Sequence, residues 1–507
     1  MERAKLRAMR EEILNGPIEK TLLMLAGPLV VNNLVQVVYN ITDTFWLGKL
    51  GREALSAPGV TWPIIGTLMA LGMGFVTAGF AFVGQYIGAG EYERANRSAG
   101  ALYSLMLFFA TATAILSLLI LPYALAFMKV TSALYPYAKT YATIIFLGVP
   151  FAFTYMAFSA LSRAAGDTKT PMKITLLTVS VNIVLDPVFI FGLGPFPRLG
   201  VAGAALATIL ANTLGSAIGL WILFKGKIGL RLSVENLKPD LEFYSKIFRV
   251  GLPASVGQSA NSFGFVVLTR IIMGFGDVTY AAYVITTRLV NFLTSISKGI
   301  SMAMGTMIAQ NVGARKYERA KAIAERTMVV NFTIAGLAVL VIGLFRVPIF
   351  RVFLNDPAVI AESKIVLEYF LVSVPFFNGI FIVVNRTFSS AGHTKKTMLL
   401  GILRLWGLRI PLSYLFGYVP ALAVAFTLPL LQKTLYLRLP LAELFGMTSR
   451  GVFFGMGLSN FLGALLALAW FMRGSWMRAI IEGREAGRGI KKRRATAKGD
   501  GGPLKGK

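Results

Sequence analysis

Long apolar stretches alternate with short polar turns along the whole chain, and this alternation limits the folds it can adopt. A helix that crosses a bilayer needs about 20 mostly apolar residues. Twelve stretches meet this requirement, six in each half: 20–46, 57–86, 98–122, 139–162, 171–194 and 200–224, then 249–274, 279–310, 324–347, 365–389, 396–418 and 451–473. The sequence therefore predicts an all-α membrane protein with twelve transmembrane helices.

Thiol and imidazole chemistry is almost missing from the chain. Its 507 residues include no cysteine and one histidine, His393, which excludes thiolate metal sites, cysteine nucleophiles and histidine-based metal cages. No GxxxxGK[ST] stretch is present, so the sequence carries no phosphate-binding loop for ATP. These absences argue against an enzyme and predict a protein without a cofactor.

Composition and charge indicate a bilayer rather than nucleic acid as the partner. Hydrophobic residues make up 55% and charged residues 15%, which leaves too little polar surface for a soluble protein of this length. The net charge is +28, and basic clusters lie between apolar stretches, where they orient a membrane protein. With a cytoplasmic N-terminus, cytoplasmic segments hold about 35 of the Lys and Arg residues and outer loops about 11. We expect a multi-pass protein of the cell membrane with both termini cytoplasmic.

An internal repeat organises the chain into two copies of one unit. QYIGAGEYERA at 85–95 matches QNVGARKYERA at 310–320, a separation of 225 residues, and the same offset pairs Pro28 with Pro253. Each copy holds six spans, and because six is even both copies have the same orientation in the membrane. The sequence predicts two parallel six-helix lobes related by a pseudo-twofold axis along the membrane normal.

The repeat also sets the predicted domain boundaries. An insertion within 419–448 interrupts the second copy; it is apolar but broken by prolines, which favours an interfacial or re-entrant segment over two further spans. The expected parts are a cytoplasmic N-terminus at 1–19, an N-lobe at 20–224, a cytoplasmic linker at 225–248, a C-lobe at 249–473 and a basic cytoplasmic tail at 474–507.

Asp43 is an acid inside the first apolar stretch. A charge at the centre of a bilayer costs roughly 2.5–3.5 kcal/mol on insertion scales, so such a residue calls for an explanation. Gln36 and Asn40 share its face of a helix through i, i+4 and i+7 spacing, and Tyr39 precedes it by four residues. One interpretation is a helix-end residue that touches lipid headgroups; the other is part of an ion site.

Asp186 is the second such acid, and it lies at a similar depth in the fifth stretch. Asn182 precedes it by four residues and so shares its face. Asp186 is followed by proline, so a kink residue is the alternative interpretation. The repeat-equivalent positions of Asp43 and Asp186 are Leu268 and Ile410, which favours a site specific to the first half. Carboxylates with neutral oxygens beside them suit a proton or a cation.

Four motifs taken together resemble the multidrug and toxic compound extrusion (MATE) family. They are YNxxDTxxxG at Tyr39–Gly48, GxGxxxRA at Gly88–Ala95, RxxGDTKTP at Arg163–Pro171 and NxxxDPxxIFG at Asn182–Gly192. The likeness covers nearly the whole chain except both tails and the insertion. It implies a secondary antiporter that expels small organic molecules, often cations, in exchange for Na⁺ or H⁺.

The resemblance also implies where the coupling ion is handled. The matching N-lobe residues are Asp43, Asn182 and Asp186, which would also be the ligands of a Na⁺ ion, with Tyr39 in the same network and Tyr141 as a further member. Pro28 corresponds to the bend in the first helix, although a fixed packing kink is an equal interpretation. Two fused lobes complete one pathway, so we expect a monomer.

A different transport function remains as the alternative. A related architecture flips lipid-linked oligosaccharides, and that function requires basic residues along the central cavity. Arginines within the second-half stretches keep it open, namely Arg270, Arg288, Arg404 and Arg409. The last two are also candidates to contact substrate or a counter-charge.

Overall fold

The N-terminal half of the chain folds into seven helices. The computed structural model describes residues 2–128, 130–354, 356–428, 433–439, 444 and 447–481. The helices of the first half are α1 (Glu2–Asn15), α2 (Ile18–Gly48), α3 (Arg52–Gly88), α4 (Tyr92–Phe127), α5 (Tyr135–Ala164), α6 (Lys169–Phe191) and α7 (Val201–Lys225). Helices α2 to α7 form the N-lobe.

The second half repeats this pattern with more interruptions. Its helices are α8 (Leu241–Met273), α9 (Asp277–Gly313), α10 (Tyr317–Leu344), α11 (Arg346–Phe353), α12 (Pro357–Tyr369), α13 (Val374–Phe376), α14 (Ile382–Ser390), α15 (Thr394–Ile402), α16 (Ile410–Tyr418) and α18 (Ser449–Met472). Helices α12 to α14 follow one another as a single segment, and a π-helical stretch at Leu403–Arg409 joins α15 to α16. Helices α8 to α18 form the C-lobe.

Twelve long helical segments confirm the predicted multi-pass membrane fold. Within the described residues, ten segments are long and apolar enough to cross a bilayer, including 357–390 and 394–418 as one segment each. The other two long helices are α8, with 33 residues, and α9, with 37 residues. Together they give six segments to each lobe, as the internal repeat predicts.

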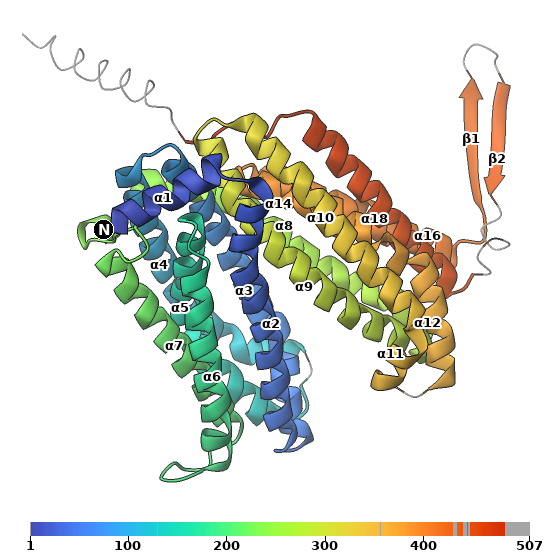
Figure 1. Ribbon diagram of the computed structural model, residues 1–507. Coiled ribbons are helices and arrows are strands. Elements are labelled where there is room, and N and C mark those ends of the chain that lie inside the picture. Colours follow the sequence, from blue (N-terminus) through green and yellow to red (C-terminus); the bar gives the residue numbers. More distant parts are fainter. Residues whose placement is uncertain are drawn as a thin grey trace, which may run out of the picture.

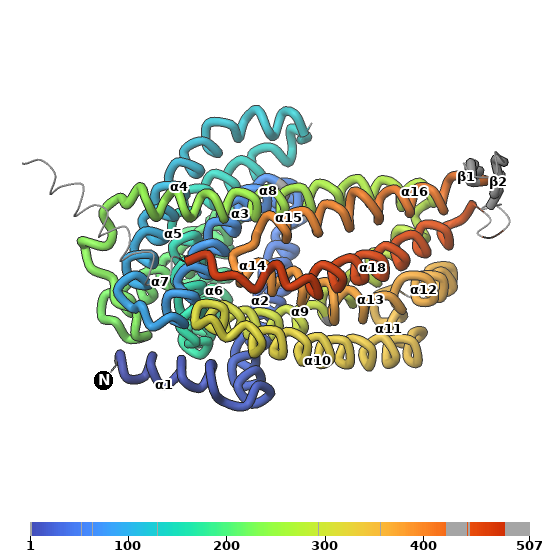
Figure 2. The backbone as a smooth tube through the Cα atoms, turned by 90° about the horizontal axis from the view of Figure 1, so that it is seen from above, coloured from blue at the N-terminus to red at the C-terminus, as the bar shows by residue number. Residues whose placement is uncertain are grey.

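The two lobes meet at one end and diverge toward the other, like the arms of a V (Figure 1). The meeting end carries α1 and is called the α1 end below; the opposite end is called the open end. The view from above shows the N-lobe and the C-lobe as two groups of helices with α2, α3, α8 and α9 between them (Figure 2). The contacts between the lobes come mainly from these same four helices.

The repeated motif forms the contact between the lobes at the α1 end. The buried Gln85 donates from Nε2 to the carbonyl of Ala391 at 3.1 Å, and its repeat-equivalent Gln310 donates to the carbonyl of Ala164 at 2.8 Å. Gly88 and Gly313 let the backbones meet: a Cβ would lie 1.9 Å from the Gln310 carbonyl oxygen in one case and 2.0 Å from that of Gln85 in the other. These four residues, Gln85, Gly88, Gln310 and Gly313, are called the interlobe contact.

Helix α1 lies across the α1 end and touches both lobes, although the sequence predicted only a cytoplasmic segment there. Arg10 donates from Nε to the Ile87 carbonyl at 2.9 Å and from Nη2 to the Gly88 carbonyl at 2.8 Å. On the other lobe, Asn311 donates to the Ile13 carbonyl at 3.3 Å. The side chains of Leu6 and Ile13 are buried, so α1 is part of the folded body.

We expect Arg10→Ala to lower the free energy of unfolding by about 1–2 kcal/mol. The guanidinium satisfies the last carbonyls of α3, where a positive charge is favoured, and hydrogen bonds from a charged group are worth roughly 1.5–3 kcal/mol before solvent exposure is considered. The measurement is thermal unfolding of the purified protein in detergent. Arg3→Ala, on an exposed position of the same helix, is the control; equal melting temperatures for both variants would contradict the assignment.

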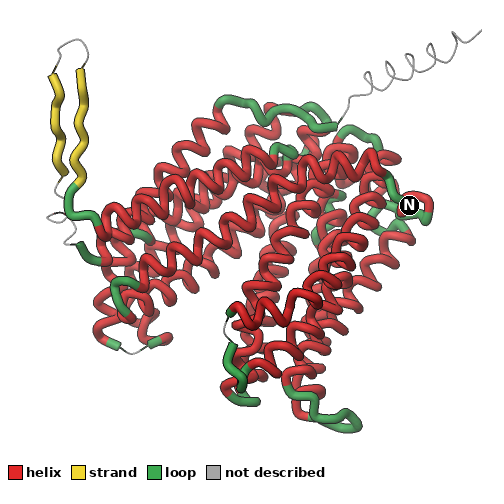
Figure 3. The backbone as a smooth tube through the Cα atoms, turned by 180° about the vertical axis from the view of Figure 1, so that it is seen from behind, coloured by secondary structure: helices red, strands yellow, loops and turns green. Residues whose placement is uncertain are grey.

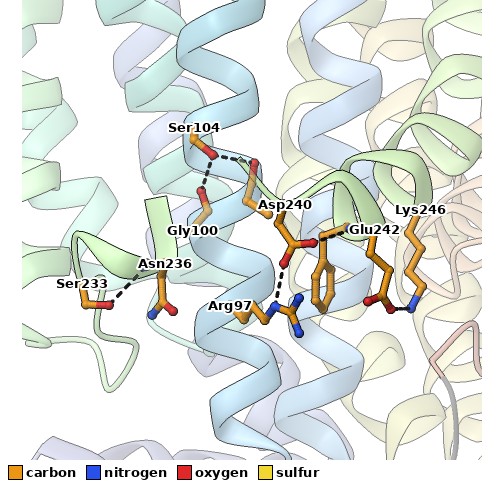
Figure 4. A network of polar contacts seen from close by, with 10 residues as sticks. Arg97, Gly100, Ser104, Ser233, Asn236, Asp240, Glu242 and Lys246 are labelled. Carbon is orange, nitrogen blue, oxygen red and sulfur yellow. Dashed lines mark hydrogen bonds and ion pairs between the residues drawn. The ribbon is translucent and has the colours of Figure 1, made fainter. Parts of the chain in front are cut away.

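The linker between the lobes folds against the N-lobe, and α8 begins at Leu241 rather than at the predicted residue 249. Asp240 caps α8 by accepting from the Phe243 N–H at 3.2 Å, and it pairs with Arg97 of α4 at 2.6 Å (Figure 4). The backbone of Asn236 lies against Gly100, where a Cβ would come within 2.2 Å of the Asn236 carbonyl oxygen. The linker therefore joins the start of the C-lobe to the flank of the N-lobe.

Part of the insertion forms two β-strands, a local addition to the predicted all-α membrane fold. Its interfacial or re-entrant placement stays a prediction. Strands β1 (Leu422–Leu428) and β2 (Lys433–Leu439) pair antiparallel, with Leu422 opposite Leu439. The hairpin stands away from the helical body at the open end of the C-lobe (Figure 3). Its sequences, LAVAFTL and KTLYLRL, include the strand-favouring residues Val, Phe, Thr and Tyr.

The structure describes only the first residues of the predicted basic tail, up to residue 481. Trp476 is buried and stacks on Phe471, and the backbone N–H of Ile480 donates to Oε1 of Gln85 at 2.9 Å. The start of this segment thus packs at the α1 end. Residues 482–507 lie outside the described residues.

Candidate coupling site

Helix α2 connects the two lobes because each of its halves packs on a different one. Leu25 and Leu29 in the first half are buried in a core that they share with α9, and Gly299 of α9 approaches so closely that a Cβ would lie 2.7 Å from a Val30 methyl group. Toward the open end, α2 packs on α6 and α7 of the N-lobe. Pro28 lies inside the continuous helix, within the half that touches the C-lobe.

Asp186 and Asn182 occupy the buried face of α6, as their i, i+4 spacing predicts. Both side chains are fully buried. In the orientation that satisfies both neighbours, the Asn182 amide donates to Oδ2 of Asp186 at 3.2 Å and accepts from the backbone N–H of Thr208 at 3.2 Å. The hydroxyl of Thr208 in turn lies 3.0 Å from the hydroxyl of Tyr39 on α2. A continuous set of polar contacts thus joins α2, α6 and α7.

Asp43 lies beside this set and leaves a carboxylate oxygen without a partner. Its side chain is half-buried, and its Oδ1 is buried with no hydrogen-bond donor. It is close enough to Asp186 for the two carboxylates to interact electrostatically, and Tyr141 of α5 interacts with both. The structure therefore brings Tyr39, Asp43, Tyr141, Asn182 and Asp186 together; these five residues are called the N-lobe polar cluster.

The chemistry of the N-lobe polar cluster suits a small hard cation or a proton. Two carboxylates supply negative charge, and phenol, amide and hydroxyl oxygens are further ligands of the kind that such ions prefer. A free carboxylate oxygen within a helical bundle costs energy unless something binds it. The unpartnered Oδ1 of Asp43 is therefore an acceptor that a bound ion or proton would satisfy.

Two of the residues predicted for the network are not bonded to it in the part of the chain that the structure describes. Gln36 and Asn40 are exposed, and neither side chain makes a hydrogen bond among the contacts of the described residues. The repeat-equivalent Leu268 is buried in the apolar core of the C-lobe. In the part of the chain that the structure describes, the two acids of the cluster thus have no carboxylate counterpart at Leu268 or Ile410.

Thr208 is a member of the network that sequence reasoning missed. Its side chain contacts Tyr39 and its backbone contacts Asn182 in the structure. In the sequence it lies among apolar residues, in GAALATIL. Threonine often bonds to its own helix backbone, so nothing in the local pattern separates it from a structural residue.

Arg404 and Arg409 are buried inside the C-lobe and contact rings and neutral groups there. The Arg404 guanidinium lies 4.6 Å from the centre of the Phe377 ring, and Arg409 donates to the Ser459 hydroxyl at 3.1 Å and to Asn460. No described carboxylate pairs with either arginine. Arg270 and Arg288 are exposed.

Comparison with known families gives two matches in the same register as the internal repeat. The family model described as MatE matches residues 28–188 and again residues 253–415, one stretch in each lobe. The model described as Lipid II flippase MurJ matches only residues 146–235. The MatE stretches together cover more than half of the chain.

Relatives and solved structures agree with this family. The chain is 28% identical to the Probable multidrug resistance protein NorM of Thermotoga maritima, over 92% of this chain and 95% of that protein. It is 25% identical to the FAD transporter of Shewanella oneidensis, over 86% and 94%. A solved MOP superfamily transporter from Pyrococcus furiosus has the same fold, with a TM-score of 0.79 at 24% identity over 92% of this chain and 98% of that one. The chain belongs to the MATE family of membrane transporters, which are not enzymes.

Proposed function

We propose that the protein exports small amphipathic organic molecules across the cell membrane in exchange for H⁺ or Na⁺. The observation that carries the proposal is the pair of neighbouring acids in the N-lobe polar cluster, one of which has a carboxylate oxygen without a partner. The relatives named for multidrug resistance and FAD transport support a small-molecule substrate. Organic cations are the class that the family resemblance suggests.

The orientation in the membrane is part of this proposal. The excess of basic residues between the spans favours cytoplasmic termini, which puts the α1 end inside and the open end outside. The lobes then have an outward-open arrangement, with the N-lobe polar cluster on the half of α2 that lies toward the open end. An ion from outside would reach Asp43 from that direction.

The proposed mechanism couples ion binding to the position of α2. A proton or a Na⁺ ion bound between Asp43 and Asp186 offsets one of their two negative charges. Its binding also changes what Tyr39, Thr208 and Asn182 bond to. Because α2 packs on the N-lobe near this cluster and on the C-lobe near Pro28, a change at one half of the helix alters its contact with the other lobe. Substrate release outside is followed by rocking of the lobes to the inward-open state.

The test is gradient-driven transport of ethidium by the purified protein in proteoliposomes. Separate vesicle sets carry a proton gradient, a sodium gradient or no gradient, and ethidium movement is followed by fluorescence. Faster transport under one gradient is expected, and that gradient names the coupling ion. If neither gradient accelerates ethidium transport, the antiport proposal is wrong. Light scattering on the same preparation tests the expected monomer.

A further inference from the structure

A cavity of about 280 Å³ lies between the lobes, on the open-end side of the interlobe contact. Its walls come from α3, α5, α9 and α14, so both lobes contribute. Two arginines line it, Arg163 from α5 and Arg386 from α14. Arg163 is the second-last residue of α5, and Arg386 lies about one turn before the end of α14. Both are therefore near the deepest point between the diverging lobes.

The two guanidinium groups make few polar contacts in the protein. Arg163 donates from Nη1 to the Ser159 hydroxyl at 2.7 Å, but its buried Nε has no partner. The Arg386 guanidinium lies 5.4 Å from the centre of the Phe80 ring, and its buried Nε also lacks a partner. Two positive charges from opposite lobes therefore face one space with most of their donors unused.

No carboxylate among the described residues forms an ion pair with either arginine. Partly buried cations without a counter-charge are destabilising, and two that border one cavity also repel each other. Arg404 also has buried donors without a partner, but it and Arg409 lie within the packed C-lobe and do not line this cavity. The cavity arginines border empty volume that a ligand can fill.

The rest of the lining indicates what kind of molecule carries the missing negative charge. It is mostly apolar, with a few hydroxyl groups: Met73, Val76, Thr77, Phe80, Tyr155, Met156, Ser159 and Met302. Methionines adapt to varied apolar shapes, whereas a guanidinium binds phosphate and carboxylate oxygens in a fixed fork geometry. The combination suits an amphipathic solute with an anionic end.

We propose that Arg163 and Arg386 together bind the phosphate or carboxylate group of an amphipathic anion, whose apolar part lies against the methionines. The inference rests on the proposed transport function and narrows its substrate class to include organic anions. It also defines a site contributed by both lobes, so the bound anion bridges them. A change in the distance between the lobes would then change the affinity.

The test compares two flavins that differ by one phosphate, FMN and riboflavin. Binding to the full chain in nanodiscs of phosphatidylcholine is measured by flavin fluorescence anisotropy. We expect FMN to bind at least about tenfold more tightly than riboflavin, because charge-assisted hydrogen bonds to a phosphate have no counterpart in riboflavin. In the double variant R163Q/R386Q this preference should disappear.

Two further variants keep the test decisive. R163K/R386K retains both charges and is expected to retain a preference for FMN, and R198Q, an exposed arginine outside the cavity, should behave as wild type. Equal binding of the two flavins by the wild type, or an unchanged preference in the glutamine double variant, overturns the proposal. If the glutamine variant does not fold, the wild-type comparison of the flavins still decides.

Competition distinguishes the possible sources of the anionic group. Displacement of FMN by inorganic phosphate indicates a free phosphate group, and displacement by phosphatidylglycerol in the nanodisc indicates a lipid headgroup; either one supports the site if it depends on the two arginines. The assay measures binding without any gradient. A positive result with failed ethidium transport therefore separates this inference from the antiport proposal.

Discussion

The D43N and D186N variants are expected to lose gradient-driven ethidium transport down to the passive background, a fall of at least about tenfold. An asparagine in place of either acid has nearly the same shape but neither takes up a proton nor balances the charge of a cation. Asp43 already has an oxygen without a partner, and among the described residues the side chain of Asp186 bonds to Asn182 alone. Both variants should therefore fold, and the loss should lie in coupling.

The matched control for these variants is D277N. Asp277 is exposed in the first turn of α9, so the same change of charge is made away from the N-lobe polar cluster. It should transport ethidium at the wild-type rate. If D43N and D186N are folded by size-exclusion chromatography and still transport at that rate, the cluster has no part in coupling.

Alanine at Gly88 or Gly313 should shift the protein away from the arrangement in which the lobes meet at the α1 end. A Cβ at either position would collide with a backbone carbonyl of the other lobe at about 2 Å, and a backbone group cannot move aside as a flexible side chain does. Overpacking typically costs 1–3 kcal/mol, comparable to the gap between alternative conformations. We expect the population with the interlobe contact to fall by about tenfold.

The absence of cysteine makes this shift easy to measure. Spin labels on E93C and E318C, at exposed and repeat-equivalent positions in the first turns of α4 and α10, report the distance between the lobes by pulsed electron paramagnetic resonance. G336A is the control, because a Cβ there meets nothing within 4 Å. A distance distribution that is the same in G88A, G336A and wild type would contradict the role of the interlobe contact.

Much of the fold follows from patterns that act over short distances in the sequence. A stretch of about twenty apolar residues can satisfy its backbone hydrogen bonds in a bilayer by forming a helix. Each transmembrane span could therefore be predicted separately from its own sequence. The pairing of Asn182 with Asp186 could also be predicted, because residues four apart lie on the same face of a helix. The repeat then fixed the number of lobes and their parallel relation.

Features that depend on contacts between distant segments could not be predicted from the sequence. Thr208 gains its place only because α7 lies beside α2 and α6. Arg163 belongs to the RxxGDTKTP motif, and Arg386 lies in the predicted span 365–389. The cavity that both residues line forms only where the two lobes meet. The helix at Glu2–Asn15 and the strands at Leu422–Leu428 and Lys433–Leu439 were missed because none of them is a transmembrane span.

The interlobe contact has the geometry of a homodimer interface within one chain. Gln85 donates to a carbonyl of the C-lobe, and Gln310 donates to a carbonyl of the N-lobe. In the same reciprocal way, Gly88 lies against the carbonyl of Gln310 and Gly313 lies against the carbonyl of Gln85. Such reciprocity is what an isologous C2 interface produces between identical subunits. A six-helix ancestor that paired with itself through this motif would already have made both halves of the contact. Gene fusion would then have freed each half to specialise, one retaining acids and the other not.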